Sequence, residues 1–199
     1  MRRVLLAVTA VAALAGCEMY QPASPDAIAA ARYVSAEPPS VTLMSMVNKG
    51  SGRSAHVGLL INASEQVLYD PAGTFTHPAL PRKGDVHYGM TPRYVDYYER
   101  YHARFDYFVE AQKVPVSAAA AEQILANAKA HGKSLKMTCA IDVAAVLKPV
   151  PQFENVPTSF FPEALRASFA AMPGVETRYV RESDVGKNRE WELPDGAGS

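Results

Sequence analysis

Cys139 is the residue of this chain that most directly suggests chemistry. It follows Thr138, a plausible N-cap, in the first turn of the apolar stretch TCAIDVAAVL, which predicts a helix. The dipole and free N–H groups of a helix N-terminus favour a nucleophilic thiolate and can donate to a developing oxyanion, and Lys136 adds positive potential. One interpretation is therefore a catalytic thiol. The other is a buried cysteine that packs as a small, inert hydrophobe.

A thiolate nucleophile needs a base, and His56 is the best placed of the five histidines. It lies at the start of AHVGLLIN, which predicts a strand, and shares one face of that strand with Gly58, Leu60 and Asn62. Gly58 leaves room above the sheet beside the imidazole. The alternative is a strand histidine with a structural role. The remaining histidines belong to a loop, a weak strand and two helix ends: His77, His87, His102 and His131.

A base is usually oriented by a third polar group, and Asp70 and Asn62 are the candidates. Asp70 ends the stretch VLYD, which pairs with the His56 strand in a predicted hairpin. Asp70 faces His56 if its partner is Gly58 or Leu60 and faces away if its partner is Leu59. The alternative for Asp70 is a residue that caps the turn before Pro71.

Metal, cofactor and nucleic-acid sites are not predicted. The sequence has no closely spaced cysteine pair, no histidines at i and i+4 and no tight histidine cluster, so a zinc site is not supported. The 20 basic and 20 acidic residues balance, without a Lys/Arg run that would indicate nucleic acid.

The elements that must position these residues alternate between strands and helices. Strands are predicted over residues 41–48, 55–62, 67–70, 84–88, 105–113 and 175–181, and helices over 91–102, 118–131, 138–147 and 161–171. Thr91-Pro92 and Ser117 supply helix starts. The order predicts an α+β fold with an antiparallel sheet covered on one side by helices. Phe160 and Phe161, at the start of the last helix, are expected in the core; the alternative is a docking surface.

The stretch AHVGLLINASEQVLYDPAG, followed about seventy residues later by MTCAIDVAAVL, resembles the circularly permuted papain-like hydrolases. This is the permuted branch of the NlpC-type peptidase superfamily, related to the lecithin retinol acyltransferase and YiiX-like proteins. In that branch a strand histidine comes first, a polar residue on the neighbouring strand second, and a cysteine at a helix N-terminus last. The order His56, Asp70, Cys139 follows this pattern, and the resemblance covers residues 41–147.

The resemblance implies a Cys-His hydrolase or acyltransferase that acts on an amide or ester bond without a cofactor. His56 would deprotonate Cys139, Asp70 would fix the imidazole, and an acyl-enzyme would form. The residues after Cys139, Ala140-Ile141-Asp142, depart from the small or aromatic pattern common in NlpC-type peptidases.

The N-terminus predicts a bacterial lipoprotein. Arg2 and Arg3 precede an apolar run at residues 4–14, which is shorter than the roughly 20 residues of a membrane-spanning helix and has the length of a signal h-region. Residues 14–17, LAGC, fit a lipobox, so Cys17 is predicted to carry palmitate-type acyl chains after cleavage. The alternative is an ordinary secretory signal. Glu18, where Asp would retain the protein on the inner membrane, favours the outer membrane.

These features divide the chain into a signal peptide (1–16), a lipidated cysteine with an Ala/Pro-rich tether (17–40), one domain (41–181) and a flexible tail (182–199). We expect a lipid-anchored envelope protein that faces the periplasm and acts on cell-wall peptides or an acyl-lipid. The alternative is a non-catalytic envelope lipoprotein that binds a cell-wall or protein partner on the same fold.

Overall fold

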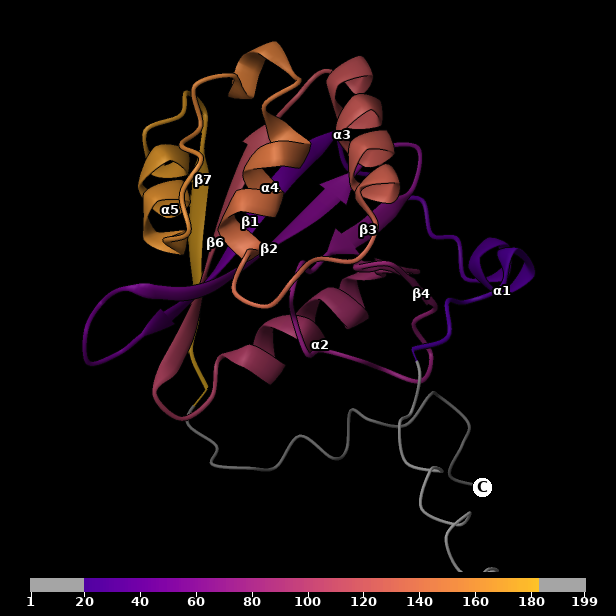
Figure 1. The fold of residues 1–199 in the computed structure, drawn as a ribbon, viewed down its shortest axis with the longest axis horizontal. Helices are drawn as coiled ribbons and strands as arrows, with labels where there is room; N and C mark the ends of the chain where they lie inside the picture. Colours follow the sequence, from indigo (N-terminus) through magenta and orange to yellow (C-terminus); the bar gives the residue numbers. More distant parts are fainter. Residues whose placement is uncertain (1–19, 183–199) are drawn as a thin grey trace, which may run out of the picture.

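The computed structural model describes residues 20–182, which form an α+β fold around one antiparallel sheet (Figure 1). Seven strands run in the order β4-β5-β3-β2-β1-β6-β7. Their bounds are β1 Ser40–Asn48, β2 Ser54–Asn62, β3 Gln66–Tyr69, β4 Arg82–Lys83, β5 Val86–Tyr88, β6 Tyr107–Pro115 and β7 Glu176–Val180. The long strands β1, β2 and β6 form the centre of the sheet, because β1 pairs along its length with both neighbours.

In this part of the chain, helices lie in two of the six connections between strands, after β5 and after β6, and one further helix precedes β1. They are α1 Pro25–Ala30, α2 Pro92–His102, α3 Ala118–His131, α4 Cys139–Leu147 and α5 Pro162–Ala170, with a short 3-10 turn, η1, at Pro151–Phe153. The hydroxyls of Thr91 and Ser117 accept the backbone N–H groups of Tyr94 and Ala120, so both predicted caps are formed. No helix within residues 20–182 is both long enough and apolar enough to cross a membrane.

The two faces of the sheet carry separate cores. Alternate side chains of β1 and β2, such as Leu43 and Leu59, pack with α3, α4 and α5 on one face. Residues of opposite parity, such as Met44 and Met46, pack with the tyrosines of α2 on the other face. The prediction that helices cover only one side of the sheet is therefore wrong, because α2 covers part of the second face with an aromatic layer.

Residues 20–40, predicted to form a tether, are bound along the edge of the domain. The backbone N–H of Ala23 donates to the carbonyl of Arg82 (2.8 Å), and that of Gln66 donates to the carbonyl of Tyr33 (2.8 Å). Asn62 donates its side-chain amide to the carbonyls of Glu37 and Pro38. The predicted signal peptide, Cys17 and residues 183–199 of the predicted tail lie outside the described residues.

The start of α5 differs from the expectation that Phe160 and Phe161 are core residues. Their exposed fractions are 64% and 74%, whereas Leu165 and Phe169 of the same helix are fully buried. The helix therefore packs through Pro162, Leu165 and Phe169 and leaves the two phenylalanines in front of it at the surface.

Candidate active site

His56 and Asp70 lie side by side on the α2 face of the sheet. Leu59 of β2 pairs with Tyr69 of β3, and the same register places Asp70 next to Gly58, the arrangement in which it faces His56. Nε2 of His56 is 2.7 Å from Oδ1 of Asp70. The Asp70 side chain is fully buried, and that of His56 is about one-fifth exposed. The buried Asp70 carboxylate thus holds the imidazole, and part of the ring remains accessible to solvent.

Tyr98 of α2 holds the Asp70 carboxylate from the other side. Its hydroxyl donates to Oδ1 of Asp70 (2.8 Å) and is completely buried. The space that Gly58 leaves above the sheet is used here, because a Cβ on Gly58 would lie 2.6 Å from the Tyr98 hydroxyl. Gly73 is required on the far side of the carboxylate, because a Cβ there would overlap Oδ2 of Asp70.

Cys139 is the first residue of α4, and its side chain interacts with the imidazole of His56. The residue is 6% exposed, and its thiol is free. It lies close enough to His56 for hydrogen-bond and charge interactions between the two side chains. Because Nε2 of His56 is bonded to Asp70, Nδ1 is the nitrogen left to accept the thiol proton.

The electrostatics favour a protonated His56. Burial by itself would lower the pKa of His56, but its hydrogen bond with Asp70 and its interaction with Cys139 outweigh burial and raise the pKa well above 6.5. Burial would raise the pKa of Asp70, yet the His56 hydrogen bond lowers it to about 2. The site therefore keeps Asp70 ionised and stabilises an imidazolium beside the thiol.

The turn before α4 fixes the position of Cys139. Thr138 was predicted to be an N-cap, but its side chain makes no cap hydrogen bond; its hydroxyl instead contacts the Leu135 carbonyl and the Asp142 carboxylate. Met137 has a φ of +68°. This left-handed backbone conformation is unfavourable for a methionine. The backbone therefore turns sharply just before Cys139, which places the thiol where it can interact with His56.

His102 belongs to this site, although the sequence placed it only near a helix end. Its ring stacks on that of His56, with centroids 6.3 Å apart, and its Nδ1 bonds the Tyr98 carbonyl at 2.9 Å. Burial lowers the pKa of His102 to about 4, despite the neighbouring Asp70 charge, so the ring is neutral. The missed signal is the α2 sequence PRYVDYYERYH, in which aromatic residues recur at helical spacing and end on His102.

An open cavity of about 290 Å³ lies beside the imidazole. His56 and His102 line it together with small residues of the turn after Asp70 and residues of β1, β2 and β6: Met46, Ala55, Ala72, Gly73, Thr74 and Tyr107. This cavity offers space for part of a substrate next to the base.

The other sequence candidates lie elsewhere. Asn62, the alternative to Asp70, is at the opposite end of β2 and is engaged with the carbonyls of residues 37 and 38. His77 and His87 pack in the aromatic layer against Tyr94 and Phe75, respectively. Nε2 of His131 lies 3.5 Å from Oδ1 of Asp142. In the part of the chain that the structure describes, no group of three or more His, Cys, Asp or Glu residues could hold a metal ion.

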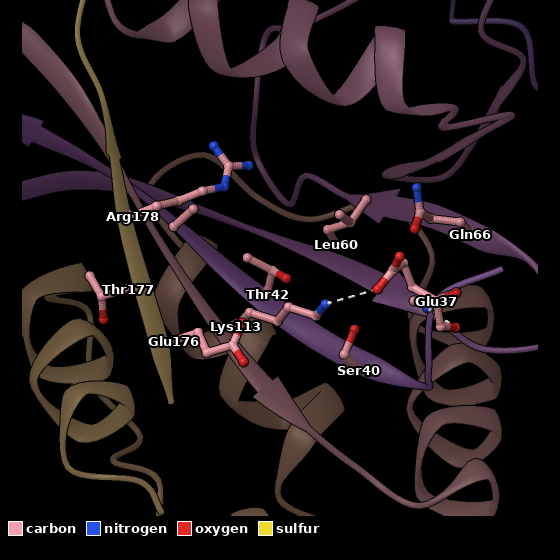
Figure 2. A pocket seen from close by; sticks show the side chains of 11 residues that line it. Glu37, Ser40, Thr42, Leu60, Gln66, Lys113, Glu176, Thr177 and Arg178 are labelled. Atoms are coloured by element: carbon pink, nitrogen blue, oxygen red, sulfur yellow. Dashed lines mark hydrogen bonds and ion pairs between the residues drawn. The ribbon is translucent and has the colours of Figure 1, made fainter. Parts of the chain in front are cut away.

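A larger cavity, about 440 Å³, lies over the other end of the sheet and does not include His56 or Cys139 (Figure 2). Two of its charged side chains are paired: Lys113 with Glu37 (3.9 Å) and Arg178 with Glu99. We assign the chemistry to the smaller cavity, because it is lined by His56, the residue that interacts with Cys139.

Comparisons of the chain with family models, with curated proteins and with solved structures gave no match. The functional argument therefore rests on the geometry of the site.

Proposed function

We propose that this chain is a cysteine hydrolase or acyltransferase of the permuted papain-like kind, with Cys139 as nucleophile, His56 as base and Asp70 as the group that orients His56. One observation carries the proposal: the His56 imidazole is bonded to a buried carboxylate through Nε2 and also interacts with the thiol of Cys139 at the start of α4. This is the arrangement that nucleophilic catalysis by a thiol requires.

The reaction starts from a thiolate–imidazolium pair, in which the proton of the Cys139 thiol already resides on Nδ1 of His56. The thiolate attacks the carbonyl carbon of an amide or ester, and the first-turn N–H groups of α4, which have no intrahelical acceptor, stabilise the oxyanion. The imidazolium then donates its proton to the departing amine or alcohol, leaving a thioester on Cys139. Water, or an alcohol or amine acceptor, attacks the thioester and gives its proton to neutral His56. The bond between the acyl carbon and sulfur breaks, which restores the thiolate–imidazolium pair.

Asp70 and Tyr98 act as positioning residues in this scheme. The carboxylate accepts the Nε2–H of His56 and so keeps the tautomer whose Nδ1 can accept a proton. The Tyr98 hydroxyl donates to the same carboxylate oxygen and so restrains rotation of the Asp70 carboxylate. Both groups are fully buried, so the geometry is set before a substrate arrives.

The order of the elements supports the permuted form. The His56 strand and the Asp70 strand precede the Cys139 helix along the chain, and α4 packs directly on β2. We place the protein in the cell envelope, lipid-anchored through Cys17 and facing the periplasm, with the outer membrane favoured, and propose a cell-wall peptide or an acyl-lipid as substrate.

Alkylation of Cys139 tests the proposal directly. The full-length protein is treated with iodoacetamide from pH 5 to 9, and modification is read at the Cys139 peptide by mass spectrometry, so that Cys17 does not contribute. We expect wild-type Cys139 to be modified at pH 6 about tenfold faster, or more, than in His56→Ala, because the imidazolium stabilises the thiolate. His131→Ala is the matched control, since His131 does not contact His56, and should match the wild type.

Equal rates in wild type and His56→Ala, or modification only after denaturation, would show that Cys139 is a structural residue. The alternative, an envelope lipoprotein that binds a partner without catalysis, would then stand.

A further inference from the structure

Four large apolar side chains are exposed around the Cys139 end of the molecule. Leu135 and Met137, in the loop before α4, are 77% and 83% exposed. Phe160 and Phe161, in front of α5, are 64% and 74% exposed. We call these four residues the apolar rim. Exposed apolar groups that gather on one side of a molecule indicate a surface that is covered in use.

The apolar rim borders the candidate active site. Met137 is two residues before Cys139, and the N-terminal ends of α4 and α5 point to the same side of the domain (Figure 1). The first turn of α5 is tied to the start of β2, because Glu163 accepts the backbone N–H of Ser54 (3.0 Å), two residues before His56. The two loops that carry the rim residues are thus linked to the site, one directly before Cys139 in the sequence and the other through the bond between Glu163 and the start of β2.

The N-terminal end of the described chain meets the same loop. Nζ of Lys133 is 5.1 Å from the centre of the Tyr20 ring, and the Arg82 guanidinium lies over the same ring at 5.6 Å. Tyr20 is three residues after Cys17, and three extended residues span at most about 10 Å. Acyl chains on Cys17 would therefore enter a bilayer close to the loop that carries Leu135 and Met137.

The charge of this loop suits an anionic lipid surface. Lys133 and Lys136 alternate with Leu135 and Met137 in the sequence KSLKM, and all four side chains are exposed. The loop is anchored rather than loose, since the N–H of Ser134 donates to Asp85 (2.8 Å). Apolar side chains next to lysines are the composition of segments that lie in the membrane interface.

We propose that the apolar rim inserts into the headgroup region of an anionic bilayer, so that the Cys139 site opens at the membrane surface. The occupant is the lipid surface itself, chosen because the predicted lipid anchor, the two lysines, Leu135 and Met137 all meet at the loop before α4. The proposal goes beyond the reaction proposed above and does not require that the site be active.

Depth-dependent quenching of a single tryptophan tests this orientation. The natural Trp191, the one tryptophan of the chain, is replaced by Phe, and Leu135→Trp or Phe160→Trp is added as the reporter. Val34→Trp is the matched control, because Val34 is also exposed (51%) but adjoins Tyr33, which bonds Gln66 at the opposite end of the sheet. Each lipidated full-length variant is reconstituted into phosphatidylethanolamine–phosphatidylglycerol vesicles with brominated acyl chains.

We expect the Leu135→Trp and Phe160→Trp variants to lose about half of their fluorescence or more, and Val34→Trp to change little, because only interfacial residues approach the bromines. Replacement of phosphatidylglycerol by phosphatidylcholine should weaken the quenching at Leu135→Trp, since the lysines lose their partners. Equal quenching at all three positions, or none at the rim, would overturn the proposal and leave a protein partner as the occupant. Cys139 alkylation of the same samples in detergent reports separately on the site.

Discussion

At the scale of single residues, the site depends on one carboxylate oxygen. Oδ1 of Asp70 accepts hydrogen bonds from both the His56 imidazole and the Tyr98 hydroxyl, while Oδ2 lies buried against Gly73. A charged group buried in this way needs its donors, because loss of one leaves part of its desolvation cost uncompensated. Tyr98 is therefore important for His56 even though it does not touch Cys139.

Tyr98→Phe should slow Cys139 alkylation at pH 6 several-fold and lower the free energy of unfolding by about 1–3 kcal/mol, because the Asp70 carboxylate loses a donor. The pH profile of alkylation, measured with urea unfolding, checks this. Tyr101→Phe is the control, since Tyr101 lies on the same helix and packs on Phe75. An unchanged profile in Tyr98→Phe would mean that the phenol only fills space.

The sequence was sufficient to propose Cys139 and His56 but not to choose the third residue. Asp70 and Asn62 both lie near the ends of β2 and β3, and the choice depends on the register across the tight turn at residues 63–65, which the structure supplies. The aromatic spacing of α2 marks Tyr98 and His102 as residues of a helix but does not place them at the site, because they reach it through packing of α2 against a face that was expected to be uncovered.

At the scale of elements, the close approach of α2 to β2 positions the site. Most strands and helices were predictable because alternation, Thr and Ser caps and prolines act locally. The pairing of these elements across the sheet and the position of α2 depend on long-range packing, which no short stretch of sequence encodes. Gly58 is the point where the two elements meet, since Tyr98 occupies the space above it.

Gly58→Ala should destabilise the domain by about 1–3 kcal/mol, because the new methyl group forces Tyr98 away from Asp70. Thermal unfolding measures the loss, and Cys139 alkylation should slow with it. Gly50→Ala is the control, since a Cβ there meets Asn48 at an ordinary contact distance of 3.4 Å in an exposed turn. Similar unfolding temperatures for the two variants would contradict this account of Gly58.

At the scale of the whole molecule, buried neutral histidines make stability depend on pH. His87 is fully buried, and neither ring nitrogen has a hydrogen-bond partner within the described chain. Burial lowers its pKa from 6.5 to about 4, although Asp70 acts in the opposite direction. Between these values the unfolded chain binds a proton that the folded chain excludes, so the free energy of unfolding falls as the pH falls from 6.5 to 4.

Between pH 6.5 and pH 4, the fall in the free energy of unfolding should be smaller in His87→Leu than in the wild type, by on the order of 3 kcal/mol. The reason is that leucine, a side chain of similar size, has no titratable group. Urea unfolding at pH 4, 5, 6 and 7 gives the dependence. His131→Leu serves as the control, since His131 is exposed. Parallel curves for His87→Leu and wild type would show that His87 does not carry this dependence.

The short path from Tyr20 to the predicted anchor at Cys17 also affects how the protein would meet its substrate. With Tyr20 held against Arg82 and Lys133, an anchored domain could not sweep far from the bilayer, and its encounters would be confined to a thin layer next to the lipid. Turnover would then scale with the number of substrate molecules per unit of membrane area. Addition of substrate-free vesicles would therefore slow turnover less than a lower density of substrate within each vesicle would.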